Sequence, residues 1–445
     1  MRRLCLSALA LGCASPALGQ TVIVPDTGAP TNGTRVGNNL FHSFNSFSLG
    51  SGDAALWMRA ANDGASIAHI VNRVTGGTAS SIDGTLATQG MPNASFWFIN
   101  PAGIVFGANA QVAVPNAAHF STAGALRLAD GATFAATTPG GSVLSVAAPV
   151  AFGFLGNQGN ITINGSTSGR LVPATTGLSL SAANIGIFSS RIVAGSLDLA
   201  AVGTGSGLIS PTQAVTNPFG NGLLLVSGSL VVGQPGVARN GLVRTFATTT
   251  NFVGSTVYGN SDVRVGGGLQ LRSGALAVDA QSYVGSFASG SAAAGPVGIT
   301  AQTVDVTGGA LASSVTGSGR GGDVAISATR VTVSNVGFIG SRTLPGATGA
   351  GGTLTINAAS VNASGGLIGT AGHGLGAAGA LTINAGAVLI DGGSINSTAF
   401  GRGDAGAIRI TSDTLDIMRG ASLSSQSADT ATGNAGNIIV RTGAL

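Results

Sequence analysis

Charged residues are few in this sequence of 445 residues, and two of the usual four types are missing. There is no lysine and no glutamate, so all 19 basic residues are arginine and all 15 acidic residues are aspartate. Lysine and glutamate support helices, whereas aspartate favours turns, so helices are disfavoured. Beyond Arg2 and Arg3 the arginines are scattered singly, and the net charge is only +4, which argues against a nucleic-acid partner.

Cysteine is missing from all but the first 13 residues, where Cys5 and Cys13 stand. Residues 1–19 have the layout of a secretory signal peptide: Arg2 and Arg3, then a short apolar run, then small residues that predict cleavage before Gln20. The sequence has no run of 18 apolar residues, so no membrane-spanning helix is predicted. We therefore expect an exported chain that folds without disulfides.

Residues that could carry chemistry are also sparse. The four histidines, His42, His69, His119 and His373, show no metal-ligand spacing and no nucleophile partner. The aspartates stand apart, and no tandem glycine–aspartate repeat typical of calcium arrays occurs. We predict no catalytic residues, no metal and no cofactor, with the first three histidines in the core or at corners and His373 in solvent.

Glycine, in contrast, is abundant, with 74 residues, or roughly 17% against a usual 7%. One short phrase, a glycine followed by alternating apolar residues, recurs along the C-terminal part. The glycines that open it are spaced 27, 30, 27, 27 and 30 residues apart: Gly295, Gly322, Gly352, Gly379, Gly406 and Gly436. Repeats of this length are typical of a solenoid.

Each repeat contains three short stretches of alternating apolar residues. In one repeat they are marked by Leu381 and Ile383, then Val388 and Ile390, then Ile395. Alternation places one side of a strand inward and the other outward. Since one coil cannot bury its own inner side, the next must stack about 4.8 Å above it. The sequence therefore predicts an all-β, single-stranded parallel β-helix with three short strands per coil.

Five sequence blocks in the N-terminal part carry a family resemblance. In chain order they are Asn39–Phe44 with Phe47, Ile70–Gly77 with Ile82–Gly84, Phe98–Gly107, Phe120–Ala123 and Ala151–Gly156. Together they resemble the secretion domain of filamentous-haemagglutinin-type exoproteins, which are the cargo of bacterial two-partner secretion. The resemblance covers about residues 30–160.

This resemblance implies that the β-helix is right-handed and that it acts as an export signal. The implied partner is an outer-membrane transporter with periplasmic recognition domains. The protein would cross the periplasm and end as a secreted or surface-exposed protein, and many such proteins are adhesins. An adhesin would bind a host-cell receptor or a surface glycan.

The implied export motif is Asn100, Pro101, Ala102, Gly103 and Ile104. Independently of the resemblance, Pro101 fixes its own φ and favours an extended Asn100, and asparagine readily starts a turn. The motif is therefore interpreted as a corner of the helix, and direct contact with the transporter stays open beside this structural role.

The predicted organisation has four parts. Residues 1–19 form the signal peptide, residues 20–160 the core of the secretion domain, residues 161–294 a continuation with degenerate coils, and residues 295–445 the regular repeats. No polar capping coil follows the last repeat, so we expect either a longer natural chain or a partner that covers this end.

Two further hypotheses come from the same residues. Arg402, Gly403 and Asp404 form the tripeptide that integrins recognise, in a loop between two repeats. The alternative function is a β-helical carbohydrate-active enzyme, either a polysaccharide lyase or a hydrolase. The scattered aspartates and the missing lysine and glutamate speak against it, because such enzymes need clustered acids and bases.

Overall fold

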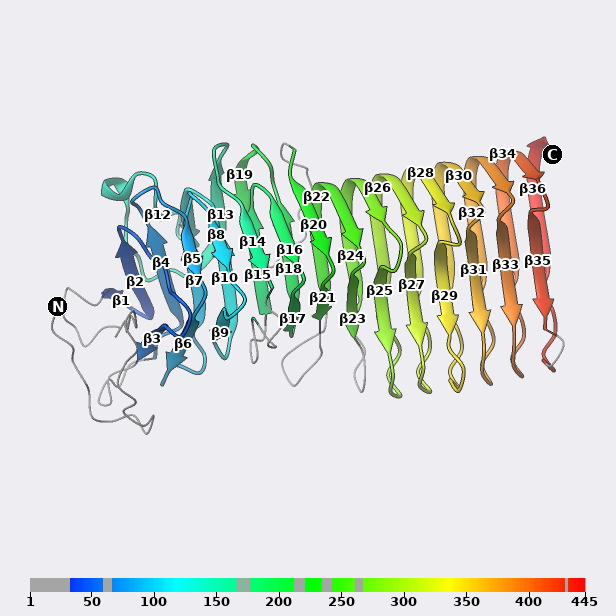
Figure 1. The fold of residues 1–445 in the computed structure, drawn as a ribbon, viewed down its shortest axis with the longest axis horizontal. Helices are drawn as coiled ribbons and strands as arrows, with labels where there is room; N and C mark the ends of the chain where they lie inside the picture. Colours follow the sequence, from blue (N-terminus) through cyan, green and yellow to red (C-terminus); the bar gives the residue numbers. More distant parts are fainter. Residues whose placement is uncertain are drawn as a thin grey trace.

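The computed structural model describes residues 33–58, 66–165, 171, 177–211, 221–233, 242–260, 267–428 and 431–444. The predicted signal peptide, residues 1–19, lies outside this part. The described residues form an elongated solenoid of about 13 turns, with strands stacked side by side along its length (Figure 1). The predicted all-β parallel solenoid is confirmed.

The first coils have three faces, each a stack of parallel strands. Strand β1 (Thr34–Val36) lies antiparallel to β2 and precedes the first coil. Face one comprises β2 (Asn39–Phe44), β4 (His69–Val74), β7 (Ser95–Ile99), β10 (Ala117–Ser121), β15 (Gly177–Ala182) and β18 (Leu197–Ala201). Face two comprises β5 (Ser80–Ile82), β8 (Ile104–Phe106), β14 (Ile161–Asn164), β16 (Ile185–Phe188) and β20 (Leu223–Ser227). Face three comprises β3 (Ala54–Met58), β6 (Thr85–Gln89) and β9 (Gln111–Ala113), then β17 (Arg191–Ala194), β21 (Leu230–Gly233) and β23 (Thr256–Asn260).

In the later coils, faces one and two join into one long strand. These strands are β22 (Val243–Val253), β24 (Leu269–Val278), β26 (Val297–Thr307), β28 (Val324–Ser334), β30 (Leu354–Ser364), β32 (Leu381–Asp391), β34 (Ile408–Met418) and β36 (Ile438–Ala444). Face three continues as β25 (Tyr283–Ala288), β27 (Ala310–Val315), β29 (Phe338–Thr343), β31 (Leu367–Gly372), β33 (Ser394–Ala399) and β35 (Ser422–Ser427). Within β32, Ile383 and Val388 are both buried although they lie five positions apart, an odd offset that would place them on opposite sides of a straight strand, so the inward side changes phase at a corner. The first two strands predicted for each repeat are the two halves of this bent strand.

The main core is a continuous column of apolar side chains inside the coils. Residues in register stack directly on one another, as in Leu354, Leu381 and Ile408, which are all fully buried. Burying such a side chain contributes about 1.5–3 kcal/mol. Since each coil covers the next, stability comes from the stacking and not from any single coil.

A separate antiparallel sheet, here called the covering sheet, lies on the outside of face one. Its strands are β11 (Ala125–Leu128), β12 (Thr133–Ala135), β13 (Pro149–Leu155) and β19 (Ser206–Ile209), with the short 3-10 helix η2 (Pro139–Gly141) after β12. A second apolar core fills the space between the two layers. It includes Phe134 and Phe152 from the covering sheet and Phe41, Trp97 and Phe246 from face one. The first coils are therefore two layers thick on this side.

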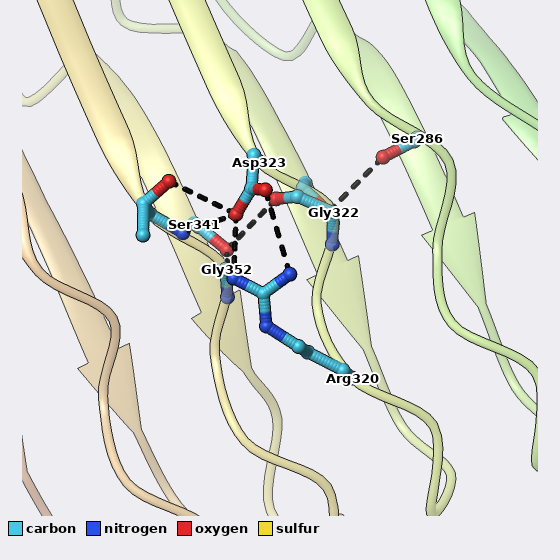
Figure 2. A network of polar contacts seen from close by, with 8 residues as sticks. Ser286, Arg320, Gly322, Asp323, Ser341 and Gly352 are labelled. Carbon is cyan, nitrogen blue, oxygen red and sulfur yellow. Dashed lines mark hydrogen bonds and ion pairs between the residues drawn. The ribbon is translucent and has the colours of Figure 1, made fainter.

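A row of hydroxyl groups runs along the inside of face three, all of them buried except the half-buried Ser425 at its end. Its members are in register on successive strands: Ser286, Ser313, Ser341, Thr370, Ser397 and Ser425. The hydroxyl of Ser341 accepts a hydrogen bond from the backbone of Gly352 (2.9 Å) and donates one to the carbonyl of Gly322 (3.3 Å) (Figure 2). The row therefore fastens face three to the corner where the next long strand begins.

The repeated glycines are required by the close approach of neighbouring coils at this corner. A Cβ on Gly352 would lie 2.1 Å from the carbonyl oxygen of Gly322, and one on Gly379 would lie 1.8 Å from that of Gly352. Carbon and oxygen cannot approach so closely without moving the backbone. The spacing of 27 to 30 residues in the sequence thus records a steric condition between coils.

The last described strand, β36, carries apolar side chains that are partly exposed to solvent. Ile438 and Val440 are in register with the buried Ile408 and Ile410, yet they are 41% and 36% exposed. Their exposure follows from their position, since no strand lies on the outer edge of β36 in the described part of the chain.

Gly352→Ala should destabilise the repeats by roughly 1–3 kcal/mol, because the new methyl group overpacks the corner. Gly298→Ala is the matched control, since a Cβ there would have its nearest neighbour at 4.0 Å. Thermal unfolding followed by circular dichroism measures both. Equal unfolding midpoints for the two variants would contradict the explanation that close approach of the coils requires glycine at position 352.

Candidate functional site

The predicted export motif occupies the corner between face one and face two in the third coil. Asn100 directly follows β7, and Ile104 opens β8. Asn100, Gly103 and Ile104 are buried, while Pro101 and Ala102 are half-buried and form the outer part of the turn. The prediction that these residues form a corner is therefore confirmed by the geometry, whereas a role in export stays a prediction.

Both the amide nitrogen and the amide oxygen of the Asn100 side chain form hydrogen bonds that stabilise this corner. Its amide nitrogen donates to the carbonyl of Thr78 and to the hydroxyl of Ser80, both at 2.9 Å, in the preceding coil. Its amide oxygen accepts from the backbone of Ala102 at 3.0 Å, which closes the turn. With a relative exposure of 1%, the side chain offers nothing for a partner to touch directly.

The backbone of the turn is fixed from the other side by the following coils. Asn100 N donates to the carbonyl of Ser121 at 2.9 Å, and Ile104 N donates to that of Asn160 at 3.0 Å. Gly103 has a φ of +125°, a conformation that side chains with a Cβ rarely adopt. Asparagine, proline and glycine thus each meet a separate geometric requirement, which explains their order in the motif.

Beneath the covering sheet lies a row of aromatic and histidine side chains on face one. Trp97 and His119 are neighbours in register, with ring centroids 4.0 Å apart, and Phe152 of the covering sheet packs against Trp97 at 5.6 Å. The Nδ1 atom of His119 lies 2.8 Å from the hydroxyl of Ser179 in the next coil. The expected core position of His119 is confirmed, and the same holds for His42, which is 5% exposed.

Burial disfavours the charged form of these histidines. It lowers the pKa of His42 to about 4, and burial together with the nearby His69 lowers the pKa of His119 to about 3. The pKa of His69 is lowered by burial as well. His373, which the sequence predicts to be in solvent, is instead half-buried and stacks on Phe400 with ring centroids 4.3 Å apart.

The tripeptide Arg402, Gly403 and Asp404 lies in a loop that is stacked against both neighbouring coils. Arg402 and Asp404 are exposed, but the Asp404 carboxylate accepts hydrogen bonds from the backbone (2.6 Å) and side chain (3.2 Å) of Asn434. A Cβ on Gly403 would lie 2.3 Å from the backbone of Gly376. The glycine and aspartate therefore have structural reasons to be there, and the receptor role stays a prediction.

Within the described ranges, no group of three or more histidine, cysteine, aspartate or glutamate side chains could hold a metal ion. No helix among the described residues is long and apolar enough to cross a membrane.

The repeat pattern of the sequence does not predict the covering sheet, which buries Trp97 and His119 on face one. Its apolar residues alternate, as in Leu126 and Leu128 or Phe152 and Phe154, but they fall outside the 27–30-residue period. This break in the period, between the blocks at Phe120 and at Ile161, was the available signal. The pairing partner β19 lies some fifty residues further on and carries no such signal.

The buried histidines predict that the N-terminal region loses stability in mild acid. The folded state keeps His42 and His119 neutral, whereas the unfolded chain binds protons near pH 6.5, so stability is complete above that pH and falls below it. Each histidine should cost about 1.4 kcal/mol per pH unit below 6.5. Trp57 and Trp97, the two tryptophans of the chain, both lie in this region, so fluorescence-detected urea unfolding at pH 7.5 and 5.0 measures it.

His119→Asn, which cannot take up a proton, is the matched variant and should lose the part of this pH dependence that His119 contributes, while the part from the other buried histidines stays. Equal urea midpoints at the two pH values in the wild-type protein would contradict the assignment.

Comparison with known proteins gives the family of the N-terminal part. Residues 26–217 match the family model described as the TPS secretion domain, where TPS stands for two-partner secretion. Among solved structures, the chain is similar to the crystal structure of the HMW1 secretion domain from Haemophilus influenzae, with a TM-score of 0.48 and 16% identity over 92% of this chain and 96% of that chain. No curated protein sequence matches the chain. Residues 26–217 therefore match the TPS secretion domain family, in agreement with the resemblance seen in the sequence.

Proposed function

We propose that this protein is an adhesin-type exoprotein whose N-terminal solenoid directs its export through a partner outer-membrane transporter. The single observation that carries the proposal is the family match over residues 26–217, since a TPS secretion domain implies an exoprotein of two-partner secretion. The proposed route leads through the periplasm to the cell surface or the medium. The proposed transporter has periplasmic domains that recognise the first coils.

The architecture supports an export route in which the chain crosses the membrane unfolded. In the stacked faces each strand pairs with strands of the neighbouring coils, so a segment of the solenoid can fold as soon as one preceding coil is in place. Cys5 and Cys13 both belong to the predicted signal peptide, so the remaining chain contains no cysteine that could form a disulfide. A closed covalent loop would hinder passage through a narrow channel.

The elongated shape supports an adhesin more than an enzyme. A long solenoid offers a repetitive outer surface for binding, whereas the alternative function, a polysaccharide lyase or hydrolase, needs grouped acids and bases. The ion pairs among the described residues are isolated pairs: Asp198–Arg244, Arg320–Asp323, Arg330–Asp305 and Arg419–Asp391. No observation on the described residues favours the enzymatic alternative.

Export should depend on the corner at Asn100. Asn100→Ala removes hydrogen bonds to Thr78, Ser80 and Ala102 and should destabilise the third coil by roughly 1–3 kcal/mol. Pro101→Ala frees the turn that Asn100 begins. In cells that carry the cognate transporter, both variants should reach the surface in smaller amounts, with normal removal of the signal peptide.

Asn384→Ala is the matched control. Its side chain is exposed on the outer side of β32 and bonds only to Asn357 among the described contacts, so export should be unchanged. Surface yield is measured by immunoblotting of intact and protease-treated cells. Normal yield of both corner variants would refute a role of the motif in export.

The integrin-type tripeptide gives a separate test of the receptor. If Arg402 contacts a host receptor, Arg402→Ala should reduce attachment to integrin-bearing cells. Arg320→Ala is the control, because Arg320 is also an exposed arginine in a glycine-rich loop between coils. Unchanged attachment of Arg402→Ala would remove the tripeptide from consideration and leave the adhesin proposal to other surfaces.

A further inference from the structure

A pocket of about 320 Å³ lies on face one at the point where the covering sheet ends. Ser210 and Pro211, which follow β19, form a wall on one side. Most of the floor is the outer side of five neighbouring strands, from β18 to β28, and Ser181 of β15 lines its edge. Its volume falls at the lower end of the range for small-ligand sites, about 300–1,000 Å³.

Two columns of outward-facing residues make up this floor. Each column consists of residues in register on β18, β22, β24, β26 and β28, about 4.8 Å apart, so that the floor is about 19 Å long. The first column is Asp198, Arg244, Gln270, Gly298 and Ala325, and the second is Ala200, Phe246, Arg272, Thr300 and Ser327. Glycine and alanine among long polar side chains leave room for a ring-shaped ligand.

The polar groups of the floor combine one half-buried ion pair with one exposed arginine. Arg244 pairs with Asp198, and the two side chains are 23% and 16% exposed. Burial raises the pKa of Asp198, although the hydrogen bond and the charge of Arg244 oppose this effect. Arg272 is exposed, and in the described part of the chain no carboxylate forms an ion pair with it.

The same columns show how the outer side of face one changes on either side of the pocket. Towards the N-terminus the first column continues as His119 and Trp97, which the covering sheet buries. Towards the C-terminus it continues as Thr355 and Thr382 on a side with no second layer. The pocket lies at the step between these two regions, where Ser210 and Pro211 at the end of the covering sheet meet the polar outer side of face one.

We propose that this pocket binds a short carboxylated saccharide, whose carboxylate pairs with Arg272 and whose hydroxyl groups bond to Asp198, Gln270 and Thr300.

The chemistry of the lining supports this class of ligand. Two arginines face one aspartate, which favours an anion, and the planar guanidinium matches a carboxylate in two parallel hydrogen bonds. Sugar hydroxyls both donate and accept hydrogen bonds, as do the amide of Gln270 and the hydroxyls of Thr300 and Ser327. Asp198 is the only carboxylate among the described lining residues, whereas glycoside hydrolysis uses a pair, so the pocket binds without cleaving.

Binding itself does not depend on export. As the contact between an adhesin and a glycan, however, the site rests on the proposed function. Measurements on purified protein test binding, and surface yield tests export, so failure of one can be told from failure of the other.

The experiment is isothermal titration calorimetry of the purified full chain with two carboxylated probes, trigalacturonate and sialyllactose. The first represents uronate polymers of plants and bacteria, and the second represents glycans of animal cells. Wild-type protein should bind at least one of them, and the methyl ester of that probe should bind about tenfold more weakly because its charge is gone. Arg272→Gln should weaken binding of the charged probe by a similar factor.

Arg409→Gln is the matched control. Arg409 is an exposed arginine in the same first column, beyond Thr382 and outside the pocket, so this variant should bind like the wild type. Circular dichroism verifies that both variants keep the fold. Absence of binding to both probes, equal binding by Arg272→Gln and wild type, or equal loss in Arg409→Gln would each overturn the proposal.

Discussion

The structure depends on how closely successive coils approach one another at the corner that opens each long strand. There the carbonyl oxygen of one glycine occupies the space where the glycine of the next coil would carry a side chain. This contact sets the distance at which the apolar column inside the coils can close and the backbone of neighbouring strands can pair. The hydroxyl row of face three then bonds to the same corner, so the steric and the polar constraint act at one place.

The outer side of face one changes character along the chain while its inner side stays the same. Near the N-terminus, Trp97 and His119 face outward and are buried by the covering sheet. Further along, the equivalent positions carry arginine, glutamine, glycine and threonine and face solvent. A single backbone repeat therefore supports a two-layered region that belongs to the secretion domain and a bare region with a different surface. The proposed ligand pocket lies at the boundary between them.

The sequence predicts the parts of this fold that depend on local periodicity. The repeat length, the strand at Leu381–Ile383 and the corner at Asn100–Pro101 all follow from residue types at short spacing. The merging of two predicted strands into β32 was not predicted, because alternation reports which side faces inward but not whether pairing continues around a bend. Asp198 and Arg244 could not be paired from the sequence either, since 46 residues and the register of the coils lie between them. The covering sheet shares this difficulty, because β13 pairs with β19 across an intervening coil.

Strand β1 gives the solenoid a direction. It runs antiparallel along β2, with Thr34 opposite Phe41 and Val36 opposite Asn39, and so occupies the backbone groups on that edge of the first coil. A parallel coil can then be added only on the opposite edge of β2, where β4 lies. Coils are thereby added in the order of the sequence. If the proposed export delivers the N-terminus first, each coil that folds outside the membrane would oppose return of the chain, so the free energy of folding would favour movement outward.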